Sequence, residues 1–396
     1  MLLSRRYGQH WKGRGRPVPR PPRSPDLNYM DFCMRVIHVL ILSLAFTMYS
    51  IQQTNGAKIL ALFNLNGKSH FVMFESLLKG LAERGHQVYV AGHFPQKKPI
   101  PNYIDISVEG SLPGLVNNFT VDFVRGLGYW NLWDFIWTLT RDMCETMLKQ
   151  PQIQELISGD HKFDLIITEI FGPDCFIGLA HTYKVPFISM ISSVAIPWAN
   201  SRIGNPDNPS FIPNYFLPYT DRMNFFQRVT NLIFNEGLKL GDYYFGELPM
   251  DELGQKYYGQ DLPPLSTLKK NTSLIFVNSH FSLNIPRPVV PGFIEVGGIH
   301  IRPGGKLPKD IETFMNEAKD GVIYFSLGSL VRGETLPKET IQMFINVFSK
   351  LPQRVLWKID GIRGLPSNVK ISKWLPQLEI LSKKQHKFVI FSKSSN

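Results

Sequence analysis

Residues 58–91 read as a strand, a turn, a helix and a second strand, and this order constrains the fold more than any other feature. Residues 58–63 form an apolar run of buried-strand length, and residues 87–91 form another. Between them, one helical face carries a series of apolar side chains: Phe71, Phe74, Leu77, Leu78 and Leu81. Gly85 stands where a C-terminal glycine ends a helix. Two strands joined by a helix pair in parallel, so we predict an α/β fold with helices on both faces of a parallel sheet.

The same alternation of strand and helix recurs further along the chain. Additional buried-strand candidates occupy residues 163–168, 185–190, 274–278, 321–327 and 355–358. A helix is expected after Pro337, because proline is favoured at a helix start. A chain of 396 residues has room for two or three domains, and the pattern predicts two successive series of strands and helices.

A stretch rich in Pro and Gly separates these two series. It covers residues 286–308 and has the composition of an interdomain connection. We therefore divide the chain into an N-terminal segment (1–55), a first domain (56–285), this connection, and a second domain (309–396).

The net charge of +11 is concentrated at the N-terminus. Residues 1–30 contain seven Lys and Arg and one Asp, so the remainder has 43 − 7 = 36 basic and 32 − 1 = 31 acidic residues. That surplus of five is ordinary for a protein surface and argues against nucleic-acid binding. The Pro/Arg-rich stretch over residues 14–25 has almost nothing to bury, which is typical of disordered sequence.

An apolar run over residues 36–51 follows Arg35 and is interrupted only by His38 and small polar residues. Its length suits a secretory signal peptide better than a membrane span, which needs about 20 apolar residues, and a signal anchor is the alternative. The signal-peptide interpretation makes Met30 or Met34 the expected initiator methionine. Glycosylation sequons begin at Asn118 and Asn271, which agrees with a chain that enters the lumen of the endoplasmic reticulum.

The cysteines of this chain are Cys33, Cys144 and Cys175. They are too few and too scattered for a disulfide framework or a four-cysteine zinc site. We therefore predict no structural zinc and no other bound metal.

His70 stands at the turn between the first predicted strand and its helix. The positive end of a helix disfavours imidazolium, so a ring there stays neutral and able to accept a proton. A solvent-facing polar residue near the helix start is the alternative interpretation. A carboxylate that orients such a base is expected at the end of a neighbouring strand, because ligands of open α/β sheets gather at the carboxyl ends of the strands. Glu169 follows the strand over 163–168, and Asp174 is a second candidate one turn further on.

Several segments together resemble the UDP-glycosyltransferases, particularly the membrane-associated animal and insect branch. The segments are residues 66–71 and 81–88, residues 163–165 with Glu169, Asp174 and Cys175, the Tyr-Phe-Ser-Leu-Gly-Ser run at 324–329, and Trp-Leu-Pro-Gln at 374–377. The resemblance covers about residues 57–390, nearly everything after the N-terminal segment. It implies the GT-B arrangement, in which the first of two Rossmann-like domains binds the acceptor and the second binds mainly the UDP-sugar.

The resemblance implies that His70 is the general base that deprotonates an acceptor hydroxyl. The acceptor oxygen then attacks the anomeric carbon of the sugar, and UDP leaves in an inverting displacement that needs no cofactor besides the UDP-sugar co-substrate. Glu169 matches the partner of this base, a position where family members commonly carry aspartate. The longer glutamate can still accept the imidazole N–H, but its extra methylene loosens the orientation of His70.

On the donor side, the resemblance assigns Gly328 and Ser329 to the phosphates, where an amide-rich turn at a helix start suits an anion. It implies that Trp374 stacks on uracil and that Gln377 hydrogen-bonds the nucleoside. Lys358 matches a basic position of the family and is expected to reach the pyrophosphate. Taken singly, Trp374 also reads as a core aromatic residue and Ser329 as a plain turn residue.

The sequence departs from its family after Gln377. The family continues with a His-Gly-Gly turn, a ribose-binding glutamate, an Asp-Gln pair for the sugar and, in the animal branch, a transmembrane helix. None of these motifs occurs in the 396 residues. We therefore expect the second domain to be incomplete and sugar transfer to be impaired.

Three functions agree with these observations. The first is a UDP-glycosyltransferase that moves a hexose or hexuronic acid to hydroxyl groups of small lipophilic acceptors. The alternatives are a catalytically silent chain that pairs with full-length relatives and a binding module for small apolar ligands. The expected partners are the UDP-sugar, the acceptor, the membrane of the endoplasmic reticulum and further copies or relatives of this chain.

Two stretches are rich in apolar side chains to which these functions assign no role. The first contains Phe119, Phe123, Tyr129, Trp130, Trp133, Phe135 and Trp137. The second, spaced like an amphipathic helix, contains Phe225, Phe226, Val229, Leu232 and Ile233. Such side chains can line a pocket for apolar acceptors, contact a membrane or pack in a helical core.

Overall fold

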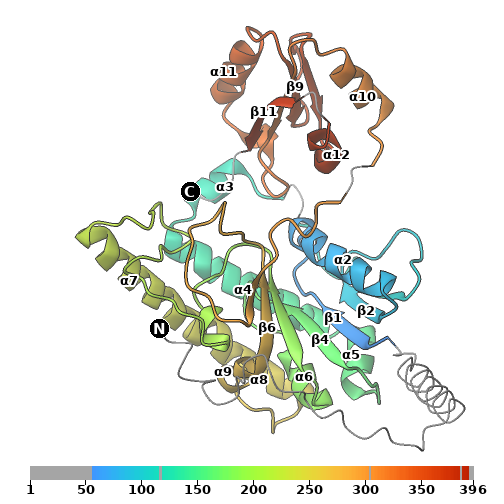
Figure 1. Cartoon of the computed structure of the whole chain (residues 1–396), viewed down its shortest axis with the longest axis vertical. Helices are drawn as coiled ribbons and strands as arrows, with labels where there is room; N and C mark the ends of the chain where they lie inside the picture. The colour runs from blue at the N-terminus through green and yellow to red at the C-terminus, as the bar shows by residue number, and fades with distance from the viewer. Residues whose placement is uncertain (1–55, 116–117, 303–304, 384–385, 392–396) are drawn as a thin grey trace, which may run out of the picture. The chain divides into compact units, whose positions relative to one another are not determined.

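The computed structural model describes residues 56–115, 118–302, 305–383 and 386–391, and it describes side chains for these residues except Tyr129, Trp130 and 386–391. The predicted signal sequence and the arginine-rich segment before it lie outside the described residues. The described chain is an α/β structure with two parallel sheets (Figure 1).

The strands and helices occur in alternation, as the sequence predicts. The strands are β1 (Lys58–Leu62), β2 (Gln87–Gly92), β3 (Tyr103–Ser107), β4 (Leu165–Glu169), β5 (Phe187–Ile191), β6 (Thr272–Val277), β7 (Phe293–Glu295), β8 (Val322–Ser326), β9 (Arg354–Lys358), β10 (Val369–Ser372) and β11 (His386–Phe391). The longer helices are α2 (Lys68–Glu83), α4 (Tyr129–Leu148), α5 (Pro151–Ser158), α7 (Phe225–Gly241), α8 (Leu248–Tyr258), α10 (Lys309–Asn316) and α11 (Lys338–Phe348). Shorter helices are α3 (Val121–Gly126), α6 (Ile177–Tyr183), α9 (Leu265–Leu268), α12 (Gln377–Leu381), η1 (Asn200–Arg202), the π-helix η2 (Asp242–Glu247), η3 (Lys269–Asn271) and η4 (Gly333–Thr335).

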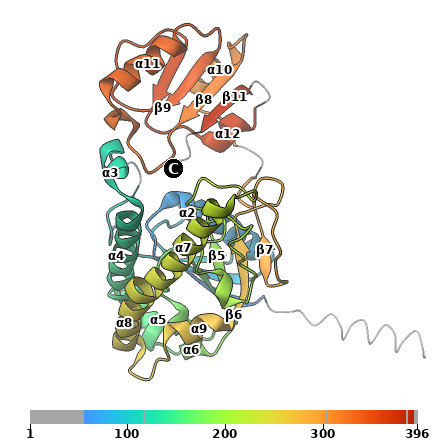
Figure 2. The same ribbon diagram turned by 90° about the vertical axis from the view of Figure 1, so that its left-hand side faces the viewer.

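The first sheet has the strand order β3-β2-β1-β4-β5-β6-β7, with every pair parallel. Side chains of β1 alternate between its faces: Ile59 and Ala61 pack with α2, whereas Leu60 and Leu62 pack with α4, α5 and α6. Helices therefore cover both faces, which is why β1 is apolar at every position after Lys58. Figure 2 shows these layers from the side.

The second sheet has the order β10-β9-β8-β11 and is also parallel. Val322, Tyr324 and Leu356 pack on the side of α10 and α12, whereas Ile323 and Phe325 pack with α11. The same alternation thus builds a second, smaller layered unit.

The observed elements confirm the predicted α/β fold class, with one difference of detail in the connection. Gly85 ends the first helical region with φ +90°, a backbone conformation that favours glycine. The predicted connection 286–308 contains a strand, because residues 293–295 pair with β6 as the seventh strand of the first sheet. Proline and glycine on either side of so short a strand concealed it.

Candidate functional site

His70 lies in the first turn of α2, which begins where the chain leaves β1. Its backbone N–H donates to the Gly67 carbonyl at 3.1 Å, and Gly67 is the extended residue that precedes the helix. The imidazole is part-buried, with an 18% exposed side chain. The ring of Phe171 contacts it edge-on, with 4.7 Å between the ring centres. An apolar wall on one side of the ring leaves the imidazole a restricted set of polar partners.

Two oxygens contact one nitrogen of this ring. Glu169 Oε1 lies 2.6 Å and Ser192 Oγ 2.7 Å from Nδ1 of His70. The Glu169 side chain is almost fully buried, and a carboxylate only accepts hydrogen bonds, so Nδ1 carries the hydrogen and donates it. The other ring nitrogen, Nε2, then holds the lone pair that can accept a proton.

The topology of the first sheet places these three side chains together. The chain leaves β1 toward β2 and leaves β4 toward β5, so the strand order reverses between the adjacent strands β1 and β4. Ligands of open α/β sheets bind at such a reversal, outside the carboxyl ends of the strands. His70 follows β1, Glu169 ends β4, and Ser192 follows β5. The Nδ2 group of Asn278, next to β6, donates to the Ser192 carbonyl at 2.8 Å and holds it there.

The second candidate carboxylate, Asp174, has a different partner. Arg202 donates to both of its oxygens, from Nη1 to Oδ1 at 2.9 Å and from Nη2 to Oδ2, and both side chains are buried. Burial lowers the pKa of Arg202, but the charge and hydrogen bonds of Asp174 more than offset this, so the pKa lies above its usual value. The structure therefore brings Glu169, and not Asp174, into contact with His70.

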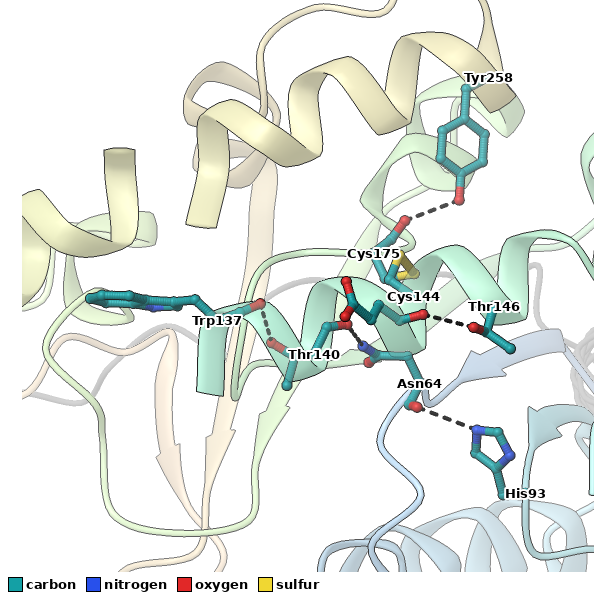
Figure 3. Close-up of a disulfide and its surroundings, with 9 residues drawn as sticks. Asn64, His93, Trp137, Thr140, Cys144, Thr146, Cys175 and Tyr258 are labelled. Carbon is teal, nitrogen blue, oxygen red and sulfur yellow. Dashed lines mark hydrogen bonds between the residues drawn. A yellow bond between two sulfur atoms is a disulfide. The ribbon is translucent and has the colours of Figure 1, made fainter. Parts of the chain in front are cut away.

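A disulfide joins Cys144 in α4 to Cys175 in the segment after β4, an observation that the sequence pattern did not reveal (Figure 3). Tyr258 donates from its hydroxyl to the Cys175 carbonyl at 3.0 Å. Asn64 donates from its side chain to the Thr140 carbonyl at 3.4 Å, one turn before Cys144. These contacts connect the segment that follows Glu169 to α4 and to the segment after β1.

The predicted donor residues follow the carboxyl ends of β8, β9 and β10. Gly328 adopts φ +87°, and its N–H donates to Ser326 Oγ at 3.2 Å, so residues 327–330 form a tight turn. Lys358, at the end of β9, donates to the Gly328 carbonyl at 2.6 Å. Burial lowers the pKa of Lys358. A small hollow is lined by Gly328, Lys358 and Lys373, among others.

Trp374 and Gln377 complete this group. The Trp374 side chain is 55% exposed, so it is not a core residue, and Lys358 Nζ lies 5.5 Å from its ring centre. Gln377 is the first residue of α12, and Tyr324 donates to its Oε1 at 3.5 Å. More than half of the Trp374 surface is therefore open to solvent.

One expectation for the donor side is wrong. Ser329 follows Gly328 in the turn, but no helix starts there, because η4 intervenes and α11 begins only after Pro337. Any anion at this turn therefore meets single amides of a loop, without the aligned dipoles of a helix behind them.

The comparisons with known proteins agree with this geometry. Residues 115–394 match the family described as UDP-glucoronosyl and UDP-glucosyl transferase. The chain is 42% identical over 357 residues to UDP-glucosyltransferase 2 of Dactylopius coccus, covering 88% of this chain and 68% of that protein. It belongs to the UDP-glycosyltransferase family.

A second relative agrees with this assignment. UDP-glycosyltransferase UGT5 of Dactylopius coccus is 40% identical, over 82% of this chain and 63% of that protein. The chain thus spans about two thirds of the length of these UDP-glycosyltransferases.

Two solved structures share the fold. The calicheamicin glycosyltransferase CalG4 aligns with a TM-score of 0.51 at 17% identity, over 85% of this chain and 75% of that one. UGT71G1 of Medicago truncatula aligns with a TM-score of 0.50 at 14% identity, over 87% and 78%. The fold is therefore that of GT-B glycosyltransferases.

Proposed function

We propose that this UDP-glycosyltransferase transfers a hexose or hexuronic acid from a UDP-sugar to a hydroxyl group of small lipophilic acceptors, with His70 as general base. The observation that carries the proposal is the 2.6 Å contact between His70 Nδ1 and the buried Glu169 carboxylate. The names of the relatives support both sugar classes, since they include glucosyl- and glucuronosyltransferases.

In this mechanism the acceptor O–H bond breaks and its proton passes to Nε2 of His70. The acceptor oxygen forms a bond to the anomeric carbon, and the bond from that carbon to the UDP oxygen breaks with its electron pair left on the diphosphate. The imidazolium that forms is stabilised by the adjacent carboxylate of Glu169. Ser192 holds the ring in place through its oxygen at 2.7 Å from Nδ1.

On the donor side we assign the uracil to the exposed face of Trp374 and the pyrophosphate to Lys358 and the Gly328–Ser329 turn. Removing even one preorganised donor from such an electrostatic site costs about 10²–10³ in rate. Among the groups that we assign to the diphosphate, Lys358 supplies the one ammonium group, and this group is already bonded to the Gly328 carbonyl. Because few donors are then assigned to the charge of the leaving diphosphate, we infer that the 396-residue polypeptide transfers sugar slowly.

The test is an assay of the purified chain with UDP-glucose, UDP-glucuronic acid and a panel of phenols, with product detected by mass spectrometry over hours. We expect His70→Ala to lower the rate by about 10²–10⁴, because general-base catalysis contributes that much, while UDP affinity is retained. Ser192→Ala is the matched control, with an expected loss of about tenfold or less, because one neutral hydrogen bond is removed. Equal rates for the wild type and His70→Ala would contradict the proposal.

We also propose that the chain resides in the endoplasmic reticulum or elsewhere in the secretory pathway. The disulfide between Cys144 and Cys175 supports this, because disulfides persist in oxidising compartments. Both sequon asparagines, Asn118 and Asn271, are exposed and accessible to glycosylation. Enzymatic deglycosylation should increase the gel mobility of the wild-type chain and leave the variant with both asparagines changed to Gln unaffected. A cytosolic wild-type chain with unchanged mobility would contradict the proposal.

A further inference from the structure

The helix α7 presents its apolar side chains outward. Phe225 and Phe226 are 73% and 78% exposed, and Ile233 is 65% exposed. With 3.6 residues per turn, the exposed apolar residues fall along one side of the helix: Phe225, Phe226, Val229, Leu232, Ile233 and Leu240. Figures 1 and 2 both show α7 at the outside of the first sheet's helices.

The inward side of the same helix is partly polar. Asn231 is fully buried, donates from Nδ2 to the carbonyls of Pro209 and Ile212, and accepts from the Asn214 N–H at 2.7 Å. One turn on, Asn235 accepts from the Asn214 side chain at 3.1 Å and donates to Asp207. Phe234 and Leu238 also face inward and pack in the core. The helix is therefore anchored by two hydrogen-bonded amides and two core residues, while six further apolar residues are left in solvent.

The exposed apolar surface continues past the end of α7 into the π-helix η2. Tyr243, Tyr244 and Phe245 are all exposed there, and Phe245 stacks on the buried Trp137 with 5.9 Å between ring centres. Contiguous apolar surface of this kind on a folded domain marks a site of contact with another apolar phase. We call the exposed side chains of α7 and η2 the outer face.

We propose that the outer face docks on a lipid bilayer, with its aromatic and aliphatic side chains in the boundary between headgroups and acyl chains. A protein partner would require directional polar contacts, about one hydrogen bond per 100–200 Å² of interface. Along the stripe on α7, Glu236 is the one charged side chain among the exposed apolar residues, and Lys239 already pairs with it at 2.8 Å. A bilayer needs only apolar area, with tyrosines at its edge and cations beside it.

The cations beside the outer face support an anionic lipid surface. Arg222 and Arg228 are exposed at the start of α7, and neither forms an ion pair with a described carboxylate. With the neighbouring Asp221, this end of the helix carries a net charge of +1. Within the residues that the structure describes, no helix is long and apolar enough to cross a membrane, so contact through α7 is interfacial.

The first experiment measures flotation of the full chain with phosphatidylcholine vesicles that contain about one third phosphatidylserine. We expect the double variant Phe226→Glu, Ile233→Glu to bind at least about tenfold more weakly than the wild type, because two inserted apolar side chains become charged. The matched control is Met343→Glu, Val347→Glu on α11, whose parent residues are 54% and 52% exposed. Both double variants change exposed side chains, and circular dichroism checks that each is folded. Equal binding by all three proteins, together with no lipid-dependent shift at position 233 in the second experiment, would overturn the proposal.

A second experiment separates the outer face from the apolar run at residues 36–51, which has its own affinity for lipid. In a Cys33→Ser background, Ile233→Cys receives an environment-sensitive dye, with Val347→Cys as its control. The remaining cysteines are joined in the disulfide and take no label. Vesicles should shift the emission of the dye at position 233 to shorter wavelength and leave the dye at 347 unchanged.

Two outcomes would contradict the proposal. Flotation without a shift at position 233 would mean that another part of the chain binds lipid. A shift at position 233 without vesicles, together with dimers in sedimentation that Ile233→Glu dissociates, would identify a second copy of this chain as the occupant of the outer face.

Discussion

The two sheets hold their candidate site residues in different ways. At the seven-stranded sheet, His70 contacts both Glu169 and Ser192, and Glu169 is buried. At the four-stranded sheet, Trp374 is more than half exposed and Lys358 contacts a backbone carbonyl. The first group is preorganised by its own contacts, whereas the second leaves more of its surface for a ligand to order. Variants in the first sheet should therefore alter stability and rate, and variants in the second should alter ligand affinity.

The largest effect is expected for Arg202→Met, which tests the rigidity of the first group. Arg202 pairs with the buried Asp174, and the nearby acidic groups of Asp242 and Glu247 also raise the pKa of Arg202. Removing one partner of a buried ion pair leaves an uncompensated charge and costs about 3–5 kcal/mol of unfolding free energy. Urea unfolding followed by tryptophan fluorescence measures the loss.

The control for that variant lies beside the second sheet. Arg332→Met breaks a solvent-exposed pair with Glu334, 3.0 Å from Nε to Oε1. Exposed pairs contribute about 0–1 kcal/mol, so unfolding should change little. If the two variants lost similar amounts of stability, the contrast between the buried and exposed charge networks would be wrong.

A pH dependence is expected from Asp242, which lies in the same buried network. Burial, followed by the charge of Glu247, raises the pKa of Asp242 from 3.8 to about 8. Because the folded pKa exceeds the unfolded one, the protonated carboxyl contributes stability that is fully present below about pH 4 and is lost as the pH rises through about 8.

The variant Asp242→Asn mimics the protonated carboxyl and isolates this contribution. Between about pH 5.5 and 7.5, wild-type stability should fall by up to about 1.4 kcal/mol per pH unit more than that of the variant. Unfolding free energies at several pH values give both slopes. Parallel slopes would show that Asp242 is ionised in the folded chain.

An effect on ligand affinity without an effect on stability is expected for Trp374→Ala, which tests the second group. Stacking of a base on an aromatic ring contributes about 1–3 kcal/mol, so UDP should bind about fivefold to a hundredfold more weakly in calorimetry. Thermal stability should stay unchanged, because the ring is 55% exposed. Trp374→Phe retains an aromatic face and should restore most of the affinity. A loss of stability with unchanged UDP affinity would make Trp374 a structural residue.

The local pattern of the sequence was enough to predict most strands near the two sites. The predicted strands at residues 58–63, 87–91 and 355–358 match β1, β2 and β9 to within one residue at each end. Apolar runs of this length are buried on both faces of a parallel sheet, so their position along the chain is sufficient evidence for a strand. The same pattern was enough to place His70 just after β1, at the start of the following helix.

The choice between Glu169 and Asp174 needed the tertiary structure. Both lie near the end of β4 in the sequence, but Arg202, 28 residues after Asp174, pairs with Asp174 in the folded chain. Ser192 carried one signal that was overlooked, since it follows the predicted strand at 185–190 in the same way that Glu169 follows its own strand. The pairing of Cys144 with Cys175 depends on α4 lying against the segment after β4.

The helix α7 separates most clearly what sequence and structure each determine. The spacing of Phe225, Val229 and Leu232 predicts an amphipathic helix, and α7 is one. Periodicity does not reveal which side faces the protein, because that depends on what packs there. Here the buried amides of Asn231 and Asn235 find partners in the segment at 207–214, and Phe234 and Leu238 on the same side pack in the core, so a second apolar side is left in solvent. Local spacing therefore determined the helix, and contacts with distant segments decided its orientation.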